Sequence, residues 1–182
     1  TSRGRASLKR ISELLDAPID VKDNTDVVET DDIKGTIEFR NLSFTFPDGD
    51  RDALKNVSFK INAGENVGIV GKTGSGKTTI VDLILRIYNI DKDMLFIDGN
   101  DVNYIPIKQV RQAAAYVPQD NFLFSDTIKS NISFYTDDED MAQIEKVAAL
   151  ADVHGNISEF ADGYDTMLGE RGVTVSGGQK QR

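Results

Sequence analysis

One stretch of the chain combines residue types and a spacing that suit phosphate chemistry. Residues 71–78 read G-K-T-G-S-G-K-T and match the phosphate-binding loop pattern G-x-x-x-x-G-K-[ST] at every fixed position. The three glycines let the backbone fold tightly, so that successive N–H groups point into one concavity. Lys77 supplies a compact positive charge for the β- and γ-phosphates, and the Thr78 hydroxyl suits a Mg²⁺ ligand. The alternative is a glycine-rich turn that happens to contain a lysine.

The sequence on both sides of this loop predicts the elements that position it. Residues 66–70 are mostly apolar and predict a short buried strand before the loop. Apolar residues recur at helical spacing after it, which predicts a helix that begins at the loop. A strand, a glycine-rich loop and a helix N-terminus together form an anion-binding site. The flanks therefore favour the phosphate-binding hypothesis over a chance turn.

Composition limits the classes to which the chain can belong. Its 182 residues are enough for one α/β domain with a real core and a small additional lobe. There is no cysteine, which excludes disulfides and thiolate metal sites and favours a reducing, cytosolic environment. The formal net charge of −9 argues against a general nucleic-acid surface and against adsorption to anionic lipid.

The N-terminal part of the chain differs in character from the rest. Residues 2–15 predict a helix with apolar residues on one face and a basic beginning, and Pro18 ends it. Residues 20–34 are acidic and nearly without pattern, which predicts a linker. The predicted domains are a connecting helix at residues 1–18, an acidic linker at 19–35 and the main domain at 36–182.

Alternating patterns predict the strands of the main domain. Residues 36–46 alternate, but the phase slips before Leu42, which predicts a β-bulge. Residues 57–61 alternate cleanly in a second strand, and residues 114–117 predict a further short strand. From residue 127 to residue 160 the pattern becomes helical.

Asp98 is a deceptive candidate for a magnesium ligand. It ends an apolar run at 94–97, as does the magnesium-associated aspartate of many phosphate-loop enzymes. However, Asp98-Gly99 is a strong tight-turn pair, and no second carboxylate follows directly. We favour a short hairpin strand over a metal site.

A second motif stands near the end of the chain. Residues 175–179 read V-S-G-G-Q, and a helix start at Ser-Gly-Gly offers bare backbone N–H groups and a hydroxyl. With the phosphate-binding loop upstream, the chain resembles an ATP-binding cassette, the nucleotide-binding domain of an ABC transporter, whose signature is L-S-G-G-Q. The resemblance covers the chain from Thr36 onward and the N-terminal helix. Locally, Ser176 is also readable as a simple helix N-cap.

The resemblance implies a fold, a reaction and partners. The fold would be α/β: a P-loop NTPase core with an antiparallel β subdomain and a helical subdomain at about residues 120–182. Two cassettes would pair head to tail, as a homodimer or a heterodimer, and trap two ATP molecules with Mg²⁺ between phosphate loop and signature. ATP hydrolysis would power export of a substrate by a transmembrane domain expected earlier on the same chain. This domain would lie on the cytosolic side of the membrane, or on the equivalent inner side of an organelle.

The resemblance also carries roles to single residues. Phe46 stands where the family places an aromatic ring, more often tyrosine, that stacks on adenine; the alternative is a core strand residue. Gln119 resembles the glutamine that contacts Mg²⁺ and the attacking water. Glu170 resembles an acidic residue that touches the transmembrane domain, and its alternative is a solvated loop glutamate. His154, the only histidine, precedes the signature and is interpreted as a surface residue.

The expected site residues fall into three groups. Catalysis is expected of Lys77 and Gln119, and metal binding of Thr78 and Gln119. The residues expected to bind nucleotide are Phe46, Gly71, Thr73, Gly74, Ser75, Gly76, Lys77, Thr78, Thr79, Ser176, Gly177, Gly178 and Gln179.

The sequence also departs from the family pattern. It ends at Arg182, inside the signature helix, where the family continues with a magnesium-associated aspartate, a glutamate base and a switch histidine. We therefore expect a fragment that is inactive in hydrolysis by itself, with unpaired strand edges where a central strand would lie. Two other functions are open: a nucleotide-gated module without turnover, and a soluble ATPase of DNA repair or translation or a nucleotide kinase. The acidic charge disfavours a nucleic-acid partner, and a kinase has no need of S-G-G-Q.

Overall fold

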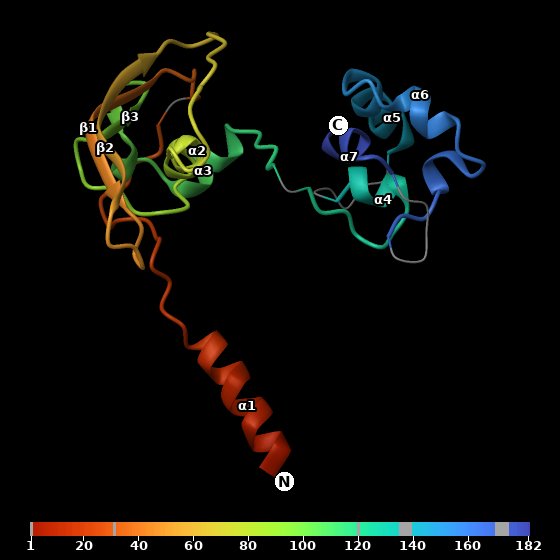
Figure 1. Ribbon diagram of the computed structural model, residues 1–182, viewed down its shortest axis with the longest axis horizontal. Coiled ribbons are helices and arrows are strands. Elements are labelled where there is room, and N and C mark those ends of the chain that lie inside the picture. The colour runs from red at the N-terminus through yellow and green to blue at the C-terminus, as the bar shows by residue number, and fades with distance from the viewer. Residues whose placement is uncertain (1, 31, 120, 135–139, 170–174) are drawn as a thin grey trace. The chain divides into compact units, whose positions relative to one another are not determined.

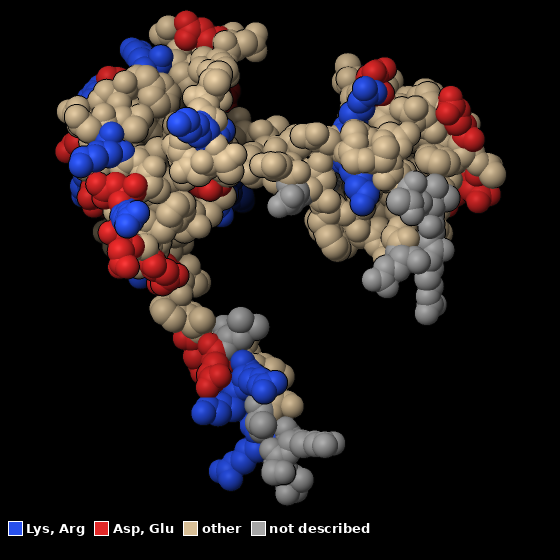
Figure 2. Space-filling view, viewed as in Figure 1, with Lys and Arg blue, Asp and Glu red and all other residues tan. Residues whose placement is uncertain are grey.

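The computed structural model consists of two compact units, Thr1–Ala115 and Tyr116–Arg182, each of which is considered by itself (Figure 1). Acidic and basic side chains are both exposed on the surface of each unit (Figure 2). The residues that the structure describes are 2–30, 32–119, 121–134, 140–169 and 175–182.

The first unit is built on a four-stranded antiparallel sheet of strand order β2-β1-β3-β4. The strands are β1 (Ile37–Thr45), β2 (Asp52–Ile61), β3 (Leu95–Ile97) and β4 (Asn100–Asp101). The predicted antiparallel β subdomain is thus confirmed, and so is the short hairpin strand before Asp98. Strand β2 begins earlier than the alternation at residues 57–61 indicated.

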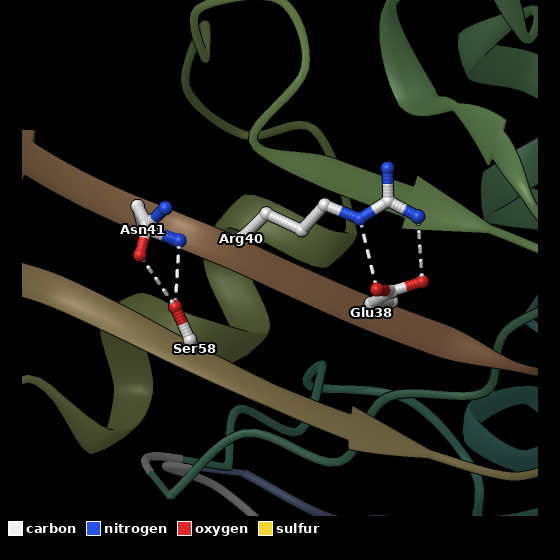
Figure 3. Close-up of polar contacts among 4 residues, drawn as sticks. All are labelled: Glu38, Arg40, Asn41 and Ser58. Atoms are coloured by element: carbon white, nitrogen blue, oxygen red, sulfur yellow. Dashed lines mark hydrogen bonds and ion pairs between the residues drawn. The ribbon is translucent and has the colours of Figure 1, made fainter.

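Two asparagines bend the β1–β2 pair in the same way. Asn41 and Asn56 adopt positive φ angles of 46° and 53°. Each backbone N–H donates to a serine hydroxyl of the opposite strand: Asn41 to Ser58 at 2.7 Å (Figure 3) and Asn56 to Ser43 at 2.9 Å. The bulge predicted in β1 is confirmed. The corresponding bulge at Asn56 interrupts the alternation of apolar and polar residues in β2. The sequence therefore showed this alternation only in the second half of the strand.

A charged pair lies on the face of the sheet that points away from the core. The Arg40 guanidinium donates to both carboxylate oxygens of Glu38, at 2.8 and 2.9 Å (Figure 3), and the hydrogen bond lowers the pKa of Glu38. Arg40 also lies 3.8 Å from the centre of the Phe96 ring. This cation–π contact explains how Phe96 is buried although it points away from the core.

Helices α2 (Lys77–Ile84) and α3 (Ile107–Gln112) pack on the other face of the sheet (Figure 1). The short 3-10 helix η1 (Val102–Tyr104) lies between β4 and α3. Together the sheet and these helices enclose one apolar core, formed by Phe39, Leu42, Leu54, Ile80, Leu83, Leu95, Ile97, Val102, Ile105 and Val110. The helix predicted after the glycine-rich loop is confirmed, and its apolar face is what fixes the loop against the sheet.

The Asp98-Gly99 turn is structural. Asp98 and Gly99 have φ angles of 50° and 82°, as a tight hairpin turn requires. The Asp98 carboxylate accepts hydrogen bonds from the backbone N–H groups of Lys34 at 2.6 Å, Gly35 at 3.3 Å and Thr36 at 2.8 Å. Its oxygens are therefore used to fasten the chain that enters β1, which agrees with the hairpin interpretation.

The chain before β1 contains helix α1 (Ser2–Leu15), with the bounds that the sequence predicted. The following segment has no helix or strand in the part of it that is described, yet hydrogen bonds hold it to η1 and α3. Asp23 accepts a hydrogen bond from the Ile107 N–H at 2.9 Å, and the Val28 N–H donates to the Tyr104 carbonyl at 2.9 Å. The division at residues 18 and 35 stays a prediction.

Two predicted strands are wrong for this structure. Residues 66–70 and 114–117 belong to no strand, and the Val70 side chain is 96% exposed. A strand is defined by ladder hydrogen bonds to a neighbour, and neither segment makes one within the described part of the chain. An apolar run is therefore not sufficient for a strand where no partner edge lies beside it.

The second unit is helical, as predicted for this region. Its helices are α4 (Ile128–Ile132), α5 (Met141–Leu150), α6 (His154–Ser158), the 3-10 helix η2 (Gly163–Asp165) and α7 (Gly177–Gln181). Ile128, Ala148, Ile157 and Leu168 form its core. Asp140 caps α5 by accepting the Ala142 N–H at 3.0 Å. Neither unit has, among its described residues, a helix long and apolar enough to cross a bilayer.

Replacing Asp98 by asparagine tests the carboxylate that fastens the start of β1. Asparagine tolerates positive φ, so the variant keeps the turn and removes the charge. We expect the free energy of unfolding at neutral pH, measured by urea denaturation, to fall by about 1–2 kcal/mol. Asp48→Asn, in the exposed turn after β1, is the matched control and should change it by less than about 0.5 kcal/mol.

The pH dependence of this difference gives a second readout. Burial raises the pKa of Asp98, but the N–H groups of Thr36, Lys34 and Gly35 lower it by more, so that it lies below the ordinary 3.8. A carboxyl with a lowered folded-state pKa contributes stability above its unfolded pKa and loses it as the pH falls through the folded one. The advantage over Asp98→Asn should therefore shrink below about pH 4. An advantage that persists unchanged in stronger acid would contradict this assignment.

Candidate nucleotide-binding site

The glycine-rich loop lies between residue 70 and helix α2 in the first unit. Gly74 and Gly76 have positive φ angles of 77° and 83°, and the Ser75 N–H donates to the Lys72 carbonyl at 3.2 Å. These left-handed residues reverse the chain twice within a few residues, which only glycine does without strain. The loop thus leads directly into the N-terminus of α2, where unpaired N–H groups favour an anion.

Two close approaches hold this loop in shape. A Cβ atom at Gly76 would lie 2.6 Å from Leu54 Cδ2 and 2.7 Å from the Ala53 carbonyl oxygen of β2. A Cβ atom at Gly71 would lie 2.5 Å from the Ser75 hydroxyl oxygen. The backbone at Gly76 therefore rests directly on strand β2, and a side chain there would push the loop away from the strand. A side chain at Gly71 would instead displace the Ser75 hydroxyl within the loop.

Lys77 points back into the loop that precedes it. Its Nζ donates to the carbonyl oxygens of Gly71 at 2.9 Å and Lys72 at 2.8 Å. Lys77 is half-buried as a residue and is the first residue of α2. The loop thus presents a fixed positive charge beside glycine N–H groups, which is the arrangement that binds a phosphate chain.

The two threonines after Lys77 differ in exposure. Thr78 is exposed, whereas Thr79 is buried in the first turn of α2. An exposed hydroxyl beside a phosphate-binding loop fits Mg²⁺, which prefers oxygen ligands and shares them with phosphates. Among the residues that the structure describes, no group of three His, Cys, Asp or Glu side chains forms a separate metal site.

Phe46 lies just after β1 and is half-buried. Its ring meets Phe44 at a centroid distance of 5.1 Å and an interplanar angle of 82°, and Tyr88 at 5.2 Å and 79°. Neither neighbour is stacked parallel on Phe46. The structure thus places Phe46 in an aromatic group just past the end of β1, and its contact with adenine stays a prediction.

The remaining expected site residues belong to the second unit. Gln119 is exposed, and Ser176 caps α7. The Ser176 hydroxyl accepts the Gln179 N–H at 3.2 Å, while the Ser176 N–H donates to the Gln179 side-chain oxygen at 2.9 Å. This reciprocal capping box confirms the local N-cap interpretation. Glycines 177 and 178 have no heavy atom within 4 Å of a notional Cβ, and the roles of this group stay predictions. Glu170 lies outside the described residues.

The sequence predicted that His154 is a surface residue, and the structure corrects this prediction. It is half-buried at the start of α6, and its Nδ1 lies 2.7 Å from the Tyr164 hydroxyl. Burial, followed by the Glu145 charge, raises the pKa of Tyr164. The histidine therefore holds η2 against α6, a tertiary contact that sequence spacing does not reveal.

Sequence reasoning missed three residues that support the site. Leu54 contacts the loop at Gly76, and the rings of Phe44 and Tyr88 pack against Phe46. Leu54 was hidden because the bulge at Asn56 interrupts the alternation of β2. Tyr88 follows α2 and gave no signal by periodicity, although three aromatic residues flanking a phosphate-binding motif could have drawn notice.

Comparison with known proteins defines the class to which this architecture belongs. Residues 54–182 match the ABC transporter family. A solved chain described as a bacterial Atm1-family ABC exporter with ATP bound matches 98% of this chain and 31% of its own length, with a TM-score of 0.85 and 35% identity. The chain belongs to the ABC transporter family, and its α/β fold is that of the ABC ATPases.

Curated relatives agree with this assignment. An uncharacterised ABC transporter ATP-binding protein of Bacillus subtilis (strain 168) is 43% identical over 181 residues, which are 100% of this chain and 31% of the relative. A putative multidrug export ATP-binding/permease protein of the same organism is 41% identical over 97% of this chain and 30% of its own length. The ATP-dependent lipid A-core flippase of Escherichia coli (strain K12) is 39% identical over 99% of this chain and 31% of its own length. The chain therefore spans less than a third of these relatives.

A pair of glycine substitutions tests the contact between the loop and β2. Gly64 and Gly76 have similar φ angles, 80° and 83°, but only Gly76 has neighbours within 4 Å of a notional Cβ. We expect Gly64→Ala to lower the free energy of unfolding by about 1 kcal/mol, the usual cost of a left-handed alanine. Gly76→Ala should add roughly 1–3 kcal/mol more, because β2 must move. Urea denaturation measures both, and equal losses would show that the contact is unimportant.

Proposed function

We propose that this chain is the ATP-binding domain of an ABC exporter. It binds ATP with Mg²⁺ at residues 71–79, and in the complete protein the bound ATP is hydrolysed to ADP and phosphate to drive export of a substrate. The single observation that carries the proposal is the Lys77 ammonium, held over a glycine loop that rests on β2. Family membership supports the choice of ATP over other phosphate ligands.

Each expected residue has a definite task in this proposal. Lys77 and the loop N–H groups hold the β- and γ-phosphates and stabilise the charge that builds up during phosphoryl transfer. The Thr78 hydroxyl would hold Mg²⁺, and the Gln119 amide oxygen would serve as a second protein ligand. Phe46 stacks on the base. Mg²⁺, when bound, neutralises phosphate charge.

The signature residues act on a second cassette. In the capping box, the Ser176 hydroxyl and the Gln179 side chain accept hydrogen bonds at the start of α7. These two bonds hold the glycines at residues 177–178 in a fixed position. Their side-chain-free backbone is open to an approaching anion. We propose that this tip completes the nucleotide site of an opposing cassette in a head-to-tail dimer, homo- or heterodimeric.

The membrane connection rests on the relatives. One of them is named an ATP-binding/permease protein, and this chain aligns with less than a third of its length. We propose that a transmembrane domain precedes this domain on the same chain, with α1 as the connecting helix and this domain on the cytosolic side. The formal charge of −9 supports a protein partner rather than nucleic acid.

A second candidate is a nucleotide-gated module without turnover. The described site residues account for binding, and we assign no general base among them. Measuring phosphate release by the complete protein separates the two functions. Release that is lost in Lys77→Ala supports the ATPase, and ATP binding without release supports the module.

Calorimetry of Mg-ATP binding to the 182-residue chain is the direct test of the site. Lys77→Ala should weaken binding at least about tenfold, because a charge-assisted contact to phosphate contributes roughly 1.5–3 kcal/mol. Lys72→Ala removes the same charge from the same loop at a variable position of the motif and is the matched control. It should bind within about twofold of the wild type. Far-UV circular dichroism checks the fold, and unchanged binding by a folded Lys77→Ala would refute the proposal.

A further inference from the structure

Three aromatic side chains form a closed group beside the phosphate-binding loop. The Phe44, Phe46 and Tyr88 rings are mutually in contact: Phe44 and Tyr88 each meet Phe46 nearly at right angles, and they meet each other at 5.6 Å and 51°. All three side chains are half-buried. Contacts of this geometry restrict the orientation of each ring.

The two neighbours of Phe46 are connected to different elements of the phosphate-binding site, Phe44 to the loop and Tyr88 to helix α2. Phe44 lies opposite Leu54 in the β1–β2 pair, and Leu54 touches Gly76. Tyr88 follows α2, which begins at Lys77. Phe46 is thus linked to the loop in two ways. One set of contacts passes through Phe44 and β2, and the other passes through Tyr88 and α2.

The segment that carries Tyr88 is itself anchored. Arg86 is buried, has a φ of 52°, and donates through a guanidinium nitrogen to the Val102 carbonyl at 2.8 Å. The Arg111 guanidinium donates to the carbonyl oxygens of Leu85 at 3.1 Å and Arg86 at 2.8 Å. The turn after α2 is therefore fixed to η1 and α3, so that Tyr88 presents its ring from a rigid support.

We propose that Tyr88 and Phe44 are positioning residues that hold the Phe46 ring at a set distance and angle from the phosphate-binding loop, and thereby select a phosphate chain that carries an aromatic base. The inference rests on the proposed ATP site and deepens it. Because neither neighbour stacks parallel on Phe46, the group supplies support without taking the stacked geometry that a base needs. Without Tyr88 the Phe46 ring gains rotamers, and base binding must then restrict them.

The test compares two ligands that share the phosphate chain and differ in the base. Dissociation constants for Mg-ATP and for inorganic tripolyphosphate with Mg²⁺ are measured on the 182-residue chain, its Phe46→Ala, Tyr88→Ala and Tyr88→Phe variants, and Tyr104→Ala. Tyr104→Ala is the matched control, because it removes a ring of the same size from the same unit, where it contacts Lys92. Tyr88→Leu keeps an apolar side chain without a ring and is measured in place of Tyr88→Ala if the latter does not fold.

The expected result is a loss confined to the ligand with a base. Phe46→Ala should weaken ATP binding about tenfold and Tyr88→Ala about fivefold, with tripolyphosphate binding within about twofold of the wild type in both. Tyr88→Phe and Tyr104→Ala should bind both ligands as the wild type does. A general packing role for Tyr88 would instead weaken both ligands equally, which overturns the inference.

The remaining outcomes separate this inference from the proposed function. If Phe46→Ala alone changes the ratio of the two dissociation constants, Phe46 needs no positioning and the inference is wrong, while the ATP site stands. If neither Phe46→Ala nor Tyr88→Ala changes the ratio, the base does not contact this group and the inference is again wrong. Failure of the wild-type chain to bind either ligand would refute the proposed function itself.

Discussion

The contact of Gly76 with strand β2 is the constraint on which the candidate site depends. A glycine at this position lets the loop backbone lie against Leu54 and the Ala53 carbonyl, closer than any side chain would permit. Helix α2 starts one residue later, so the same contact sets where its N-terminus and Lys77 lie. Interior packing is dense and deforms little, so a shift of β2 would be transmitted to the loop.

The bulges at Asn41 and Asn56 determine which side chains β1 and β2 offer to this contact. Each bulge shifts the alternation by one residue, so that Phe39 and Leu42, like Leu54 and Val57, are three residues apart and still face the core. A one-residue slip without the bulges would turn Leu54 to the other face. The serine hydroxyls that accept the two asparagine N–H groups hold the slip in place. Polar contacts at the surface of the sheet thus determine which apolar side chains of β2 lie beneath the loop.

The candidate functional residues are divided between two separately packed units. The first contains the loop, Lys77 and the aromatic group, and the second contains Gln119 and the signature tip at α7. Each unit has its own apolar core.

The sequence by itself determined the features that depend on neighbouring residues. The loop motif predicted α2 and Lys77, the Asp98-Gly99 pair predicted a hairpin, and the Ser176 pattern predicted an N-cap, because turns and caps are made within a few residues. Only the tertiary structure decided the long-range facts: that residues 66–70 form no strand, that Arg86 is buried, and that Tyr88 meets Phe46. The physical reason is that strand pairing, burial of a charge and ring contacts depend on partners distant in the chain, and periodicity carries no information about them.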